Sequence, residues 1–170
     1  MKVKKQSLIF WGLNALAVLL AMIIQYNGTF TVRIGGANPM LPLCICLAFS
    51  MLSGEVTGVI TSLFIGIVTD SAASTPAYFH TIVFMLFSLS VALTVRYVFN
   101  NNVRSAAVIG ICDSLLYYLL RFLFCVPKNG AEDSVGYLMQ YALPSVIYTS
   151  VLVIPIYFFY KWLFNRYYTR

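Results

Sequence analysis

The chain has 170 residues, of which 61% are hydrophobic and 9% charged, and its mean hydropathy is +0.85. Because a helical span needs about 20 mostly apolar residues, this composition indicates an integral membrane protein with five or six spans and excludes a sizeable soluble domain. The net charge of +6 does not indicate nucleic acid binding, since the basic residues stand at the ends of apolar segments, where they act as topology signals.

Six apolar segments predict an all-α integral membrane protein, a six-transmembrane-helix bundle forming one polytopic domain over residues 1–170. The second segment is short and has Pro39 and Pro42 near its start, so it is either a tilted span or a partly re-entrant segment. With six alternating helices, eight of the eleven Lys and Arg residues fall on one side, which predicts that both termini are cytoplasmic. The expected spans cover 7–25, 39–53, 54–72, 79–98, 104–126 and 144–164.

The first segment follows a basic start, as a signal peptide does, but no small-residue cleavage site comes after it. We therefore expect it to remain as the first span. Ala17 and Ala21 lie four residues apart in this segment and form a small-residue patch on one helix face. Such a patch is a candidate docking site for another helix.

The third segment carries a stripe of five residues at a spacing of four: Gly54, Gly58, Ser62, Gly66 and Asp70. Each step of four turns only about 40° around a helix, so these residues share one face. In lipid, small residues are favoured where helices approach closely. The stripe therefore predicts a helix-packing or partner interface that ends in a carboxylate.

Asp70 has two interpretations, because it lies near the outer end of its span. It could cap the local turn and touch water, or it could anchor a partner helix or form an internal ion pair. His80, at the outer start of the fourth segment, is the single histidine of the chain. We expect His80 to be an interfacial residue rather than a ligand.

The fifth segment contains two membrane-embedded charges, Asp113 and Arg121, with Tyr117 between them on the same helix face. Asp113 and Arg121 lie about 12 Å apart along the helix axis, too far for direct contact. In the predicted topology Arg121 reaches the same depth as Asp70. We therefore hypothesise that Asp70 and Arg121 form an ion pair.

The sequence does not favour catalysis or a cofactor. The two intramembrane aspartates suggest an aspartyl protease, but the run Gly110 to Asp113 lacks the second glycine of the GxGD signature. The four cysteines lie in apolar stretches without the spacing of a disulfide framework or a zinc site. We expect no enzyme activity, no catalytic residue, no metal and no cofactor.

The order of these features resembles the bacterial rod shape-determining protein family MreD. The resemblance covers nearly the whole chain and is carried by the basic start, Asn38-Pro39, the asparagine-rich turn before Arg104 and the closing run 143–148 with Pro155. It also includes the spacing Gly54-x3-Gly58-x7-Gly66-x3-Asp70. One departure is the run 72–76, where the family often has a glycine soon after the aspartate.

The resemblance implies a non-enzymatic, multi-pass subunit of the cell-wall elongation machinery in the bacterial plasma membrane, supporting cell shape and lateral peptidoglycan synthesis. Its implied partners are membrane lipid, MreC as the direct partner, and MreB with a peptidoglycan polymerase and transpeptidase as members of the same complex. The family is thought to share the fold of the S component of energy-coupling-factor vitamin transporters. A vitamin-binding S component is therefore the alternative, with Arg33, Asp70, His80 and Arg121 as polar groups toward the outer side.

Overall fold

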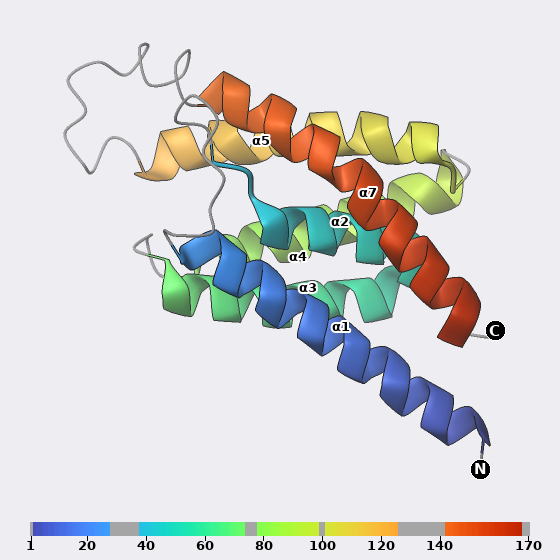
Figure 1. Ribbon diagram of the computed structural model, residues 1–170. Coiled ribbons are helices and arrows are strands. Elements are labelled where there is room, and N and C mark those ends of the chain that lie inside the picture. The colour runs from blue at the N-terminus through green and yellow to red at the C-terminus, as the bar shows by residue number, and fades with distance from the viewer. Residues whose placement is uncertain (1, 28–37, 74–77, 99–100, 126–141, 168–170) are drawn as a thin grey trace.

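The computed structural model describes residues 2–27, 38–73, 78–98, 101–125 and 142–167, and this part of the chain is all-helical (Figure 1). Five of its helices are long and apolar enough to cross a membrane, and the remaining helix is a shorter apolar one. The predicted all-α class is thus confirmed, while a count of six full spans is not. Arg33, one of the polar groups expected toward the outer side, lies outside the described residues. The helices are α1 (Lys2–Tyr26), α2 (Leu41–Ser53), α3 (Glu55–Ala72), α4 (Phe79–Tyr97), α5 (Val103–Cys125) and α7 (Leu143–Tyr167).

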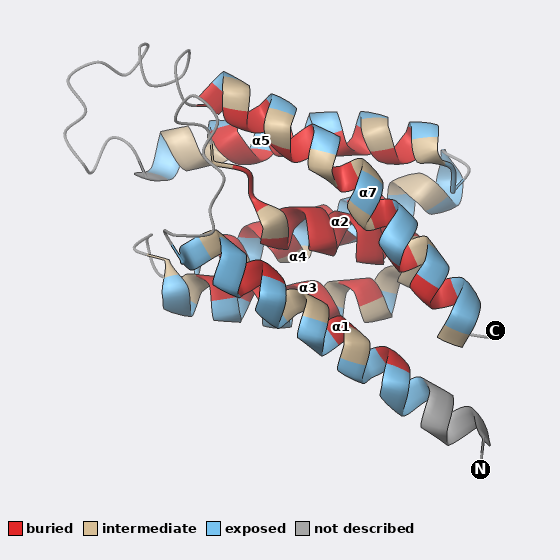
Figure 2. Ribbon diagram, in the orientation of Figure 1, coloured by how far each residue is buried: buried red, intermediate tan, exposed pale blue. Residues whose placement is uncertain are grey.

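The helices alternate in direction, so that α1 begins and α7 ends at the same end of the bundle (Figure 1). The outward faces of the helices carry many exposed apolar side chains, whereas buried residues face the interior (Figure 2). Such an exposed apolar surface is the one expected of a protein immersed in lipid.

The short helix α2 forms the centre of the bundle. Every residue from Pro42 to Met51 is buried, and Figure 2 shows almost the whole helix in red between its neighbours. Its 13 residues rise only about 20 Å, less than the roughly 30 Å of a bilayer core. A helix that is apolar on all sides is stable when protein surrounds it, which explains why the shortest helix lies innermost.

The ends of α2 are satisfied by other parts of the chain. At its start, the backbone N–H groups of Met40 and Leu41 donate to Thr149 Oγ1 (3.2 Å) and Gln25 Oε1 (3.0 Å). At its end, Gly54 alone separates α2 from α3 and has a φ of +87°, a conformation that favours glycine. Unpaired backbone groups are costly away from water, so the two hydrogen bonds at the start of α2 help to hold this short helix in place.

Hydroxyl pairs connect buried helices inside the bundle. Ser50 of α2 lies 2.6 Å from Ser88 of α4, and Ser114 of α5 lies 2.9 Å from Ser150 of α7. An aromatic cluster joins α1, α2 and α7, with Phe10 4.9 Å from Phe164 between ring centroids. Hydrogen bonds between helices and close packing are the main sources of helix association in lipid, so these contacts stabilise the bundle.

Candidate functional site

The small-residue stripe of α3 packs inside the chain. Gly58, Ser62 and Gly66 are all buried. A Cβ atom added at Gly58 would lie 3.1 Å from Cα of Ser50 in α2, and one added at Gly66 would lie 2.5 Å from Cα of Thr81 in α4. The stripe thus lets α3 approach both α2 and α4, and these buried positions are covered by the chain's own helices.

Gly54 and Asp70 stand at the two ends of this stripe and have different surroundings. Gly54 is exposed at the turn between α2 and α3, and a Cβ atom added there would meet nothing within 4 Å. Asp70 lies in the last turns of α3, next to the start of α4. The five residues of the stripe therefore have three different roles. Gly54 forms the turn, the three middle residues form a buried helix contact, and Asp70 supplies a carboxylate at the end of the helix.

The carboxylate of Asp70 caps the N-terminus of α4. Its Oδ1 accepts the backbone N–H of His80 at 2.9 Å, and its Oδ2 accepts the backbone N–H and the hydroxyl of Thr81 at 2.9 and 2.6 Å. The N-cap residue of α4, Tyr78, provides no side-chain cap. A carboxylate is favourable beside the unpaired N–H groups of a helix start, so Asp70 supplies from α3 the cap that α4 lacks.

His80 connects this cap to the fifth helix. Its Nδ1 lies 2.8 Å from Asp70 Oδ1, and its Nε2 lies 3.0 Å from the hydroxyl of Tyr117. In the neutral ring, a proton on Nδ1 is donated to Asp70, and Nε2 accepts from Tyr117. The side chain of His80 is only 2% exposed. The prediction that His80 is an interfacial residue is therefore wrong.

Among the described residues, the Asp70 carboxylate contacts His80 and Thr81, and the hypothesised ion pair with Arg121 stays a prediction. Arg121 lies in the same region: it lines a cavity of about 270 Å³ together with Gln25, Tyr26 and His80. Depth in the membrane paired the two charges in the hypothesis and left His80 out of it. The available signal was that Asp70 and His80 are ten residues apart at the facing ends of consecutive helices.

Asp113, the other embedded carboxylate, is separate from this network. Its Oδ2 is buried and has no hydrogen-bond partner among the described residues. Tyr117, one turn further along α5, is fully buried and contacts His80. Of the predicted polar face of α5, Tyr117 thus belongs to the Asp70–His80 network, Arg121 lines a cavity with His80, and Asp113 has a buried oxygen without a partner among the described residues.

The first-helix patch of Ala17 and Ala21 borders an apolar groove of about 320 Å³ between α1, α2 and α7. Ala21 is buried and Ala17 is half-buried. Pro155 and Tyr160 of α7 line the opposite side. The patch therefore faces the chain's own helices over part of its length.

The network of Asp70, His80, Thr81 and Tyr117 holds helix ends together. Both carboxylate oxygens and both ring nitrogens are engaged by neighbouring groups. The described residues contain no group of three or more His, Cys, Asp or Glu side chains placed to hold a metal ion. What this arrangement does chemically is to join α3, α4 and α5 at one end of the bundle.

Comparison with known proteins gives one match. The model of the family described as rod shape-determining protein MreD matches residues 5–167. No curated protein and no solved structure matches the chain. The comparisons therefore add no support for the vitamin transporter alternative or for the expected S-component fold.

Proposed function

The chain belongs to the MreD family of rod shape-determining proteins, and on that premise we propose that it is a non-enzymatic membrane subunit of the bacterial cell-wall elongation complex. In this role it supports lateral peptidoglycan synthesis by holding partner proteins through contacts between helices. The resemblance found in the sequence is confirmed at the level of the family, and the apolar helices make this a multi-pass membrane protein.

The observation that carries this proposal is the family match over nearly the whole chain. The distribution of polar groups supports it. Asp70, His80 and Tyr117 bind one another inside the bundle, whereas the outward faces are largely apolar. A protein built this way offers neighbours a surface for packing, because its hydrogen-bonding groups are mostly used within its own fold.

The proposed partners follow from the same role. We infer that the direct partner is MreC, a protein with a single span, and that MreB and a peptidoglycan polymerase and transpeptidase are further members of the complex. Both termini are assigned to the cytoplasm, where the basic residues of the chain's two ends are favoured. The protein then lies in the plasma membrane with its basic ends on the side where MreB assembles.

Depletion of the chain in its native rod-shaped cell tests this function. We expect depleted cells to become round and lose labelled peptidoglycan precursor along the side wall, while vitamin uptake stays unchanged. Expression of the wild-type chain should restore both width and labelling. Depleted cells that stay rod-shaped, or that lose vitamin uptake instead, contradict the proposal.

A second measurement addresses the direct partner. The tagged chain, extracted in mild detergent, is expected to co-purify with MreC. The Gly12→Ala variant is a suitable positive control, because a Cβ atom at Gly12 meets nothing within 4 Å. Failure of MreC to co-purify from cells in which the tagged chain restores rod shape would argue against direct docking.

A further inference from the structure

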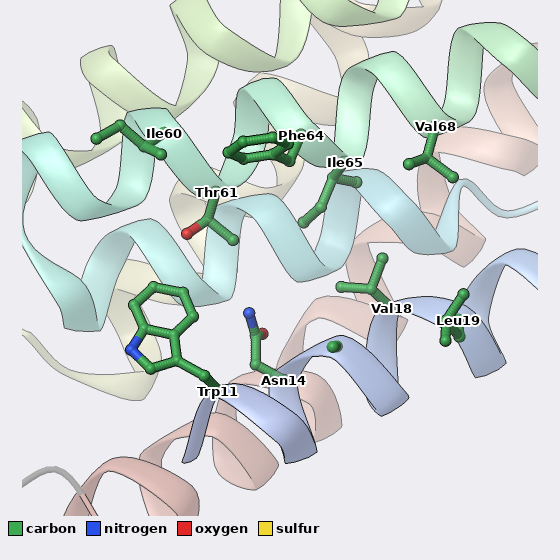
Figure 3. Close-up of a pocket in the computed structure, with 10 residues that line it drawn as sticks. Trp11, Asn14, Val18, Leu19, Ile60, Thr61, Phe64, Ile65 and Val68 are labelled. Carbon is green, nitrogen blue, oxygen red and sulfur yellow. The ribbon is translucent and has the colours of Figure 1, made fainter. Parts of the chain in front are cut away.

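A groove of about 560 Å³ lies between α1 and α3 on the outer surface of the bundle. The two helices are in contact near their C-terminal ends, where the Tyr26 hydroxyl donates to the backbone carbonyl of Thr69 at 3.5 Å. Towards its N-terminal half, α1 packs instead on α2 and α7 through Phe10. The space left open is lined by Trp11, Asn14, Ala15, Val18, Leu19, Ile60, Thr61, Phe64, Ile65 and Val68 (Figure 3).

Asn14 is the polar group at the α1 side of this groove. Its side chain is 4% exposed, and its Oδ1 accepts the hydroxyl of Tyr160 at 2.8 Å. Its Nδ2 has no acceptor among the described residues, and Figure 3 shows it directed from α1 towards α3. An amide N–H without a partner in a nonpolar setting is costly, so this nitrogen can bind an acceptor that enters the groove.

The depth of Asn14 limits what can supply that acceptor. The apolar part of α1 runs from Ser7 to Tyr26, and Asn14 is seven residues from its start, about 10 Å along the axis. In a hydrocarbon core of about 30 Å, a groove at this depth opens onto acyl chains, which have no hydrogen-bond acceptor. A membrane-spanning helix can provide one at this depth, through a side-chain oxygen or a free backbone carbonyl.

Thr61 adds a second polar group on the α3 side. It is buried, and its hydroxyl donates to the backbone carbonyl of Thr57 at 2.8 Å, which leaves its lone pairs available as acceptors. The groove thus presents a donor and an acceptor between apolar walls. Hydroxyl and amide groups of this kind are the ones that join helices in lipid.

We propose that this groove binds one transmembrane helix of a partner protein, which places an acceptor oxygen against Asn14 Nδ2. The occupied stretch runs from Trp11 to Leu19, about 12 Å or two helical turns. The proposal rests on the proposed function, because it specifies the surface at which a partner span docks. It assigns to Asn14 the role of positioning that span in depth and rotation.

Site-specific photocrosslinking in native membranes tests the proposal. A photoreactive residue at Phe64, which is 63% exposed in the groove, should give an adduct whose crosslinked peptide lies in a membrane span of a different protein. The matched control is Ile147 on α7, which is 67% exposed and does not line the groove. The control position should give lipid adducts alone.

Two variants connect the adduct to the groove. Asn14→Leu removes the donor and should lower the yield from Phe64 about three- to tenfold, the effect of one hydrogen bond between helices. Ala15→Phe fills the groove without changing Asn14 and should abolish the adduct even if Asn14→Leu does not fold. Tyr160→Phe removes the internal bond of Asn14 but leaves Nδ2 in place, so it should retain the adduct.

Several outcomes overturn the proposal: lipid adducts alone at Phe64, adducts to a second copy of this chain, equal protein adducts at Ile147, or a yield unaffected by Ala15→Phe. The experiments distinguish failure of the groove proposal from failure of the proposed function. If Ala15→Phe still restores rod shape and partner co-purification in depleted cells, the groove is not the docking site, while the proposed function stands. If depletion itself leaves cell shape unchanged, the proposed function fails.

Discussion

Asp70 of α3 and Thr81 of α4 are joined twice, since the carboxylate accepts both the backbone N–H and the hydroxyl of Thr81. The same threonine lies directly beside Gly66, one turn earlier in α3. A close backbone contact and a helix cap therefore meet at one residue. The cap depends on the close approach, because a larger side chain at Gly66 pushes away the residue that Asp70 binds.

Replacement of Gly66 by alanine should destabilise the protein. The added Cβ atom would lie 2.5 Å from Cα of Thr81, so α3 and α4 must move apart. Overpacking of this kind costs about 1–3 kcal/mol, and thermal unfolding in detergent micelles measures it. The control is Gly12→Ala, where nothing lies within 4 Å of the new atom. Equal stabilities of the two variants would contradict the close contact.

Exchange of the charges at Asp70 and Arg121 should not restore stability. Asp70→Arg removes the acceptor for the start of α4 and for His80, and an aspartate at position 121 cannot replace that cap. The double variant should be no more stable than Asp70→Arg alone, with a coupling free energy below about 0.5 kcal/mol. A full thermodynamic cycle measures this coupling. Recovery of stability in the double variant would support the hypothesised direct pair.

Removal of the Tyr117 hydroxyl should destabilise the protein through the loss of its contact with His80. Tyr117→Phe removes the contact at 3.0 Å to Nε2, and the loss of one intramolecular hydrogen bond costs about 0.5–1.5 kcal/mol. In a background of His80→Phe the same change should cost much less, which a double-mutant cycle detects. Tyr148→Phe is the control, since no hydrogen bond of Tyr148 is present among the described residues. Equal losses in both backgrounds would show that the two side chains act independently.

Asp113 should behave differently from Asp70 when each is replaced by leucine. The Asp113 carboxyl has a buried oxygen without a partner in the described part of the chain, so Asp113→Leu should keep or raise the midpoint of thermal unfolding. Asp70→Leu removes the acceptor of several hydrogen bonds and should lower the midpoint of thermal unfolding. A loss at Asp113 as large as that at Asp70 would mean that Asp113 has a stabilising partner.

The membrane class and the helical character of this protein could be predicted from sequence because both depend on composition and local order. A run of apolar residues long enough to cross a bilayer must satisfy its own backbone groups, and a helix does this within one segment. The small residues at Gly58, Ser62 and Gly66 could also be assigned to one helix face from their spacing. These inferences need no knowledge of which helices are neighbours.

The partners of individual polar residues depended on the tertiary structure. Depth in the membrane placed Asp70 and Arg121 at one level, but only the packing of α3 on α4 shows that the carboxylate binds His80 and Thr81. The burial of α2 at the centre and the free amide nitrogen of Asn14 likewise follow from contacts between distant segments. Hydropathy reports whether a segment favours lipid, whereas a hydrogen bond requires two atoms within about 3 Å, and that distance is set only when the helices pack.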